Sequence, residues 1–212
     1  MSSTLLREKT VYLIIFSVLV QLLTLIQPKA AELKSYDIIN GLARPVGIPK
    51  TADKNASHID PQFLIGGKDE DFIRTLPADN LSETQRTELN LYIIKQDLPR
   101  IDIDINFAFA SDKPLSSSMA IIEIISNALK SPQLASNRFL VAGHTDSVGS
   151  ASSNLTLSNK RAAAVRQILI SKYNIDPRRL VAVGFGFDRL KIESDPLSSQ
   201  NRRVEIVNLG PI

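Results

Sequence analysis

The sequence predicts an α/β domain over residues 98–212, an α+β two-layer sandwich with helices on one face of a small mixed sheet. Residues 101–107 (IDIDINF) alternate apolar and polar side chains, which is typical of a strand with one buried face. Residues 116–130 instead repeat apolar side chains at helical spacing. Residues 139–142 form a continuous apolar run, which indicates a more central strand.

The remaining elements complete the order β-α-β-α-β-β. A long helix is expected from about Ser153 to Tyr173, where Asn174 supplies a C-cap and a proline soon follows. Residues 180–186 (LVAVGFG) and 202–208 (RRVEIVN) are expected to form the third and fourth strands.

Residues 1–31 have the pattern of a targeting segment. Arg7 and Lys9 precede an uncharged, largely apolar run over residues 11–26, as in a secretory signal. A helix of this length extends about 24 Å, which is short of the hydrocarbon core of about 30 Å and favours cleavage. The segment is therefore expected to be a signal peptide or, if it is retained, an N-terminal membrane anchor. In both cases the rest of the chain leaves the cytoplasm.

Residues 32–97 are expected to form a spacer with short helices. Residues 35–43 (SYDIINGLA) have the pattern of a short amphipathic helix, and the loop-like stretch around His58 suggests that this histidine is solvated. Ser82 and Gln85 form a capping-box pattern ahead of a second helix. That helix is expected either to pack on the C-terminal domain or to hold it away from a membrane.

Composition narrows the possible functions. The chain has no cysteine, which excludes thiol catalysis, disulfides, cysteine-ligated zinc and a lipid-modified cysteine. It has only two histidines, which leave little material for a metal site, so neither a metal nor another cofactor is expected. The net charge is only +3, and aromatic side chains do not alternate with basic ones, so no nucleic-acid partner is expected.

The segment from Phe139 to Val165 is the most informative part of the chain. Asp146 follows the end of a predicted strand, and Arg161 lies on the next helix, where the two charges can flank one pocket. Such a pocket suits a small zwitterion that carries both an ammonium and a carboxylate. The alternative from these residues alone is that Asp146 caps the turn and Arg161 lies along the surface.

In order and spacing, this region resembles the OmpA-like peptidoglycan-binding domain, which OmpA porins, Pal lipoproteins and MotB stator subunits share. The resemblance covers roughly residues 100–208. It rests on Phe107, Phe109, Ser111, Gly143, His144, Thr145, Asp146, Gly149, Asn154, Leu157, Ser158, Arg161, Ala162, Val165, Gly184, Gly186 and the run Asn201 to Ile206. Members often carry acidic residues in the first motif, where this chain has Ala108 and Ala110.

The resemblance implies that the domain binds the diaminopimelate residue of the peptidoglycan stem peptide without covalent chemistry. It implies that Asp146 pairs with the ammonium of the ligand and that Arg161 binds its carboxylate. The residue types fit these roles, because a guanidinium can bind a carboxylate bidentately and lysine cannot. Asn154 lies two helical turns before Arg161, so its amide is expected to satisfy further groups of the ligand or the loop.

Four further residues have expected roles around this site. Thr145 and Leu157 are expected to shape the walls of the pocket, and Arg203 to support it or to contact a backbone carbonyl. His144 is expected to be a hydrogen-bonded structural residue, because the sequence offers it no evident carboxylate or metal partner.

The function expected from the resemblance is a non-enzymatic anchor that holds an envelope component to the cell wall of a Gram-negative type of cell. The expected place is the periplasm or cell envelope, either associated with the outer membrane or anchored in the inner one. Further expected partners are a membrane, if residues 1–31 are retained, and a second copy of the chain. A MotB-like membrane subunit is the alternative, although residues 11–26 lack the carboxylate that an ion-conducting helix needs. A hydrolase that uses His144 and Asp146 has no nucleophile or metal cluster to support it.

Overall fold

The computed structural model describes residues 33–43, 68–108 and 111–212. The expected targeting segment and the loop around His58 lie outside these residues. Within the described ranges, no helix has both the length and the apolar character to cross a membrane.

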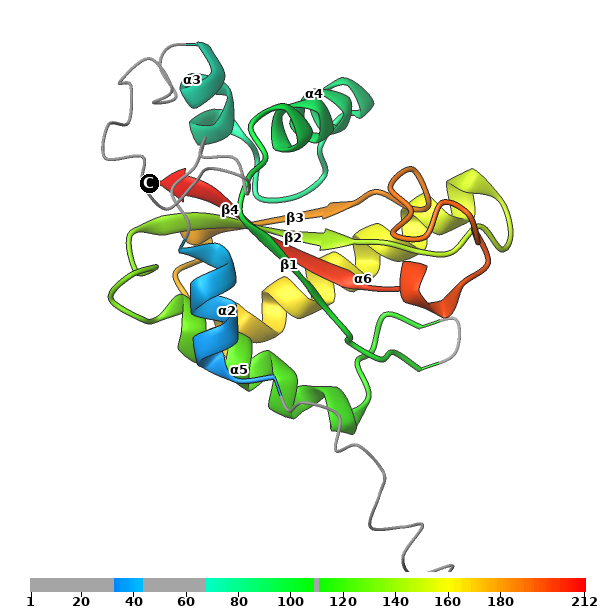
Figure 1. Cartoon of the computed structure of the whole chain (residues 1–212). Coiled ribbons are helices and arrows are strands. Elements are labelled where there is room, and N and C mark those ends of the chain that lie inside the picture. The colour runs from blue at the N-terminus through cyan, green and yellow to red at the C-terminus, as the bar shows by residue number, and fades with distance from the viewer. Residues whose placement is uncertain (1–32, 44–67, 109–110) are drawn as a thin grey trace, which may run out of the picture. The chain divides into compact units, whose positions relative to one another are not determined.

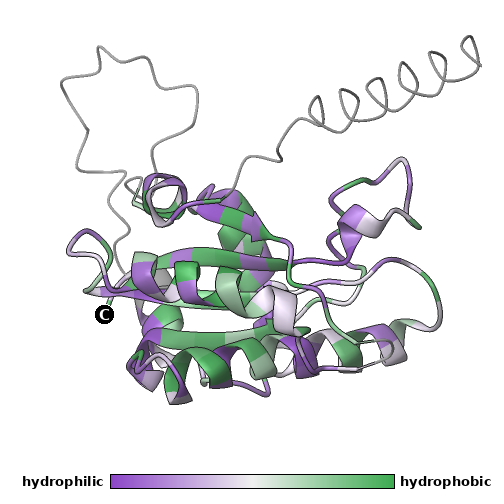
Figure 2. Cartoon of the chain, turned by 90° about the horizontal axis from the view of Figure 1, so that it is seen from below, coloured by the Kyte–Doolittle hydropathy of each residue, from purple (hydrophilic) through white to green (hydrophobic). Residues whose placement is uncertain are grey.

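Four strands form one mixed sheet in the order β1-β4-β2-β3 (Figure 1). They are β1 (Arg100–Ile103), β2 (Asn137–Gly143), β3 (Leu180–Gly184) and β4 (Val204–Pro211). β2 and β3 run parallel, whereas β4 lies antiparallel to both β1 and β2. The predicted mixed sheet and the order β-α-β-α-β-β are confirmed. Figure 2 shows the strands largely in the colour of hydrophobic residues, as expected for a sheet that is covered on its faces.

The first strand is shorter than predicted. β1 ends at Ile103, which pairs with Val204, and Val204 is the first residue of β4. Beyond that point β1 has no ladder partner, and the chain turns so that the Ile105 N–H donates to the Ile103 carbonyl. The predicted alternation nevertheless persists in the burial, because Ile103 and Ile105 are buried while Asp104 between them is exposed.

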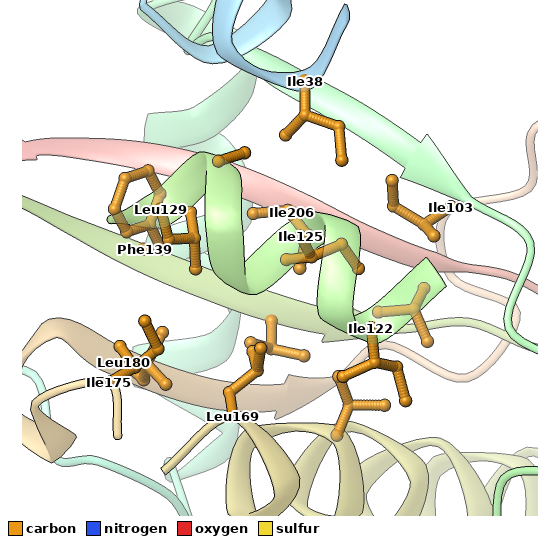
Figure 3. Packing of buried hydrophobic residues seen from close by; sticks show 14 of the residues in the cluster. Ile38, Ile103, Ile122, Ile125, Leu129, Phe139, Leu169, Ile175, Leu180 and Ile206 are labelled. Carbon is orange, nitrogen blue, oxygen red and sulfur yellow. The ribbon is translucent and has the colours of Figure 1, made fainter. Parts of the chain in front are cut away.

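Three helices cover one face of the sheet: α2 (Ser35–Leu42), α5 (Met119–Leu129) and α6 (Ala151–Ser171). α5 and α6 match the two helices predicted for this domain, and α2 matches the predicted short helix. The apolar core between these helices and the sheet is shown in Figure 3. Its labelled members are Ile38, Ile103, Ile122, Ile125, Leu129, Phe139, Leu169, Ile175, Leu180 and Ile206.

The opposite face of the sheet is covered by α3 (Lys68–Thr75) and α4 (Glu83–Lys95) (Figure 1). The predicted capping box begins α4: the Ser82 hydroxyl accepts from the Gln85 N–H, and the Gln85 side chain accepts from the Ser82 N–H. Leu89 and Ile93 of α4 join an apolar cluster with residues of β2, β3 and β4. The prediction of helices on one face therefore describes residues 98–212, and the preceding residues add a second helical layer.

The described helices of the predicted spacer belong to the same compact unit as the sheet, Leu33–Ile212. Hydrogen bonds join residues 33–97 to the sheet: Asn208 Nδ2 donates to the carbonyl of Leu42 at the end of α2 over 2.8 Å, and the Ala182 N–H donates to the carbonyl of Ala78, between α3 and α4, over 2.8 Å. The predicted boundary at residue 98 thus marks a change in the sequence pattern, but the helices before it pack on the sheet that follows it.

α6 lies very close to the ends of β2 and β3. A Cβ atom on Gly143 would lie 2.3 Å from the Ser158 carbonyl oxygen, and one on Gly184 would lie 2.2 Å from the Asn159 nitrogen. The Asn159 side chain also accepts from the Gly184 N–H over 2.6 Å. Glycine at these two positions therefore allows α6 to lie close to the sheet, and Arg161 is positioned with this helix.

Candidate functional site

The carboxyl ends of β2 and β3 meet at one edge of the sheet, where crevices form in α/β layers. A cleft of about 430 Å³ opens beside them. The chain after β1, the residue after β2, the helix α6 and the segment before β4 all contribute to it. Its lining residues are Asp104, Ile105, Asn106, Phe107, His144, Arg161, Ser199, Gln200, Arg202 and Arg203. Three guanidinium groups make the cleft suited to an anionic group.

Arg161 is held from two sides. Its Nε donates to the Ser111 carbonyl over 3.2 Å, and its guanidinium lies 4.8 Å from the centre of the Phe107 ring. Burial lowers the pKa of Arg161, the charge of Arg202 lowers it further, and the charge of Asp146 raises it. Its two terminal nitrogens have no hydrogen-bond partner among the described residues, so they can donate to a ligand in the cleft.

Asp146 lies beside the cleft and reaches it through another residue. Its Oδ2 is 2.6 Å from Arg202 Nη1, and its Oδ1 accepts from the Val148 N–H over 3.2 Å. Arg202 lines the cleft, while the mostly buried Asp146 does not. Asp146 therefore pairs with Arg202 in the structure, and the charges of both residues act on Arg161, so the three charges lie close together at the edge of the cleft.

Arg202 lines the cleft but was not among the residues predicted for the site. It stands next to Arg203 in the run Asn201 to Ile206, and only the second arginine of that pair was selected. Arg202 is only partly buried, so it can make room for a ligand or share Asp146 with one. The fourth strand was predicted to begin at Arg202, but β4 begins at Val204, so strand alternation does not describe how the two arginines are placed.

Asn154 takes the loop-binding role that its prediction allowed, and the predicted wall residues Thr145 and Leu157 do not line the cleft. Asn154 uses both amide hydrogens on the loop before α6, at 2.8 Å from the Val148 carbonyl and 3.2 Å from the Ser150 carbonyl. Thr145 is buried, and its N–H donates to the Gly186 carbonyl. Leu157 is half-buried on α6. None of these three side chains lines the cleft. Thr145 and Leu157, the two predicted wall residues, are thus outside the lining of the cleft in the structure.

Arg203 both lines the cleft and supports it. Its Nε donates to Asp102 Oδ1 over 2.7 Å, and its Nη1 donates to the carbonyls of Arg189 and Asn201 at 3.2 and 3.4 Å. These carbonyl contacts match the supporting role expected for it. Burial would raise the pKa of Asp102, but the charges and hydrogen bonds of Arg203 and Lys191 lower it overall, so Asp102 stays ionised.

His144 has a carboxylate partner that the sequence did not reveal. Its Nε2 lies 3.3 Å from Glu205 Oε2, and its ring stacks on Phe185 at 5.7 Å between centroids. Burial lowers the pKa of His144, against the opposing effect of Glu205, so the imidazole is neutral at neutral pH. Arg189 Nη1, at 3.1 Å, also contacts the carboxylate of Glu205. The sequence could not show this pair, because it depends on the register between β2 and β4.

The region that carries most of the cleft is similar to known proteins. The model of the OmpA family matches residues 106–203. Outer membrane porin F of Pseudomonas aeruginosa is 33% identical over 136 residues, which cover 60% of this chain and 38% of that protein. Outer membrane porin F of Pseudomonas fluorescens is 34% identical over 108 residues, covering 50% of this chain and 32% of that protein. The chain thus spans well under half the length of these relatives.

Among solved structures, the peptidoglycan-associated lipoprotein of Burkholderia pseudomallei is similar, at 29% identity and a TM-score of 0.42. The similarity covers 49% of this chain and 87% of that chain.

Proposed function

We propose, from the premise that residues 106–203 form an OmpA-like domain, that this chain binds peptidoglycan non-covalently and anchors an envelope component to the cell wall. The ligand group is the diaminopimelate of the stem peptide. The observation that carries the proposal is the row of charges at the cleft, in which Arg161 and Arg202 stand near the carboxylate of Asp146. The names of the curated relatives, both outer membrane proteins, support a place in the envelope.

The free end of diaminopimelate carries an ammonium and a carboxylate on one carbon atom. Its carboxylate fits between Arg161 and Arg202, where it would relieve the repulsion between the two guanidinium groups. Its ammonium would then lie beside Asp146. A carboxylate has about four acceptor positions, so Asp146 can accept from the ligand in addition to Arg202 and the Val148 N–H.

The strength of binding follows from the number of these contacts. A hydrogen bond to a charged group contributes about 1.5–3 kcal/mol. A few such bonds, less the entropy lost by the ligand, give a Kd in the micromolar to millimolar range for one stem peptide. Weak single contacts suffice on a polymer, because a protein held at the envelope meets many copies of the ligand.

We propose binding without turnover. The imidazole at the cleft, His144, is only 1% exposed and lies against Glu205, so its environment suits a structural role better than proton transfer to a ligand. Release of any product from purified muropeptides by the full-length protein would contradict this part of the proposal.

The test is co-sedimentation of the full-length chain with isolated diaminopimelate-type sacculi. The wild type is expected to sediment with them, and Asp146→Ala and Arg161→Ala to remain in the supernatant. Asp176→Ala is the matched control, because Asp176 also lies 2.6 Å from an arginine, Arg178, but away from the cleft. Sedimentation that is unchanged in both cleft variants would refute the proposal.

A further inference from the structure

The three arginines that line the cleft are held to different degrees. Arg203 is buried, and its guanidinium donates to a carboxylate and to two backbone carbonyls. Arg161 is half-buried, and its guanidinium contacts a backbone carbonyl and an aromatic ring. The side chain of Arg202 is 49% exposed, and among the described residues its one hydrogen-bond partner is the carboxylate of Asp146. Arg202 is therefore the least restrained arginine of the cleft.

Arg202 occupies the oxygen of Asp146 that a ligand in the cleft would need. Asp146 Oδ1 accepts from the Val148 N–H, and Asp146 Oδ2 is 2.6 Å from Arg202 Nη1. The Asp146 side chain is only 11% exposed, and Arg202 lines the cleft where Asp146 does not. An ammonium that approaches Asp146 from the cleft therefore meets the guanidinium of Arg202. It must either displace this guanidinium or share the carboxylate with it.

Arg161 adds a second positive charge close to this carboxylate. Burial and the charge of Arg202 lower the pKa of Arg161, against the charges of Asp146 and Asp112, so the two guanidinium groups repel each other in the free protein. An ammonium alone would bring a third positive charge to the same place, where like charges a few ångströms apart repel. A carboxylate on the same carbon atom as the ammonium would relieve this repulsion, because it gives Arg202 a new partner when the ammonium takes Asp146.

We infer that Arg202 is a specificity-determining residue, which disfavours ligands that bring an ammonium alone and favours those that carry an ammonium and a carboxylate together. The inference rests on the proposed function, because it concerns the ligand of the same cleft. Arg202 acts twice: it competes with the ligand for Asp146, and it binds the carboxylate of the ligand. An arginine that served only as a carboxylate ligand would do the second and not the first.

The experiment compares two soluble muropeptides, one with diaminopimelate and one with lysine at the same position, on the full-length wild type and on Arg202→Gln. In isothermal titrations, Arg202→Gln is expected to bind the lysine form about tenfold more tightly than the wild type does, because the ammonium no longer competes with a guanidinium. It is expected to bind the diaminopimelate form about tenfold more weakly, because a contact with the carboxylate is lost. The two affinities thus change in opposite directions.

Two further variants separate charge from other effects. Arg202→Lys keeps the positive charge, so it is expected to bind the lysine form as weakly as the wild type does. Arg178→Gln is the matched control, because Arg178 also lies 2.6 Å from an aspartate, Asp176, but away from the cleft lining, and both affinities are expected to stay unchanged. Thermal unfolding of both Arg202 variants is expected to stay close to that of the wild type, since the Arg202 side chain is half exposed.

Each other result overturns the inference. Unchanged binding of the lysine form by Arg202→Gln would show that Arg202 is only a carboxylate ligand. Weaker binding of both forms would show that Arg202 supports the cleft as a whole, and tighter binding of the lysine form by Arg202→Lys would show that the positive charge does not disfavour the ammonium. In these cases the wild type still binds the diaminopimelate form and sacculi, so the proposed function stands. Failure of the wild type to bind either of them would remove the proposed function together with the inference.

Discussion

Replacing Arg161 by lysine keeps the positive charge at the cleft and removes the planar guanidinium. The arginine contributes a hydrogen bond to the Ser111 carbonyl and a cation–π contact with Phe107. Loss of these contacts is expected to lower the free energy of unfolding by about 1–2 kcal/mol. Its two terminal nitrogens are expected to bind a carboxylate bidentately, and a lysine ammonium cannot reproduce that geometry. Affinity for a diaminopimelate muropeptide is therefore expected to fall about 10- to 100-fold, or about 1.4–2.8 kcal/mol.

Arg166→Lys is the matched control on the same helix. The Arg166 side chain also donates to backbone carbonyls, through Nε to Leu180 over 2.9 Å and through Nη2 to Pro177 over 3.2 Å. It does not line the cleft. Both variants are expected to lose a similar amount of stability in urea titrations. Only Arg161→Lys is expected to lose affinity when binding is measured by fluorescence anisotropy with a labelled muropeptide. Equal affinities of the two variants would refute the reasoning.

Three further predictions concern the scaffold of the site. Ile93→Ala on α4 is expected to lower the free energy of unfolding by about 2–5 kcal/mol in urea titrations, because Ile93 is fully buried against the second face of the sheet. A decrease below about 1 kcal/mol would show that α4 packs loosely on the sheet. Gly184→Ala is expected to lower both the melting temperature and the affinity for muropeptides, because the added Cβ would meet the backbone nitrogen of Asn159 on α6. An unchanged melting temperature and affinity would contradict the close approach of α6 to Gly184. The pKa of His144 is lowered in the folded state, so the unfolded chain binds the extra proton first and stability is expected to fall as pH drops below about 6.5. In His144→Gln this pH dependence should be smaller, and identical pH profiles of the two proteins would contradict the burial of a neutral imidazole.

Local sequence patterns predicted the elements of this fold well because each depends on neighbouring residues. Ser82 and Gln85 form the capping box that their spacing indicates. The long helix ends at Ser171 with Lys172 as its C-cap, so the predicted cap Asn174 lies two residues beyond it, where it has φ of 55°, a left-handed conformation that asparagine tolerates. The continuous apolar run from residue 139 lies in β2, between β4 and β3, as expected for a central strand.

Features that depend on contacts between distant residues were harder to predict. α4 buries Leu89, Tyr92 and Ile93, which stand at helical spacing in the sequence, but that pattern left open whether the helix packs on the domain or holds it away from a membrane. The pairing of His144 with Glu205 depends on the register of two strands that are far apart in sequence. The position of Arg202 over Asp146 depends on the path of the segment before β4. The place of the cleft, at the carboxyl end of β2, could be predicted from the sequence, whereas the arrangement of its charges could not.

The most direct test is a comparison of two muropeptides, one with diaminopimelate and one with lysine at the same position, because lysine retains the ammonium and lacks the carboxylate. Isothermal titration of the full-length wild type is expected to give about 10- to 100-fold tighter binding of the diaminopimelate form, the contribution of a bidentate carboxylate contact. Equal affinity for the two peptides would contradict the assignment of Arg161 and Arg202 as the carboxylate site beside Asp146.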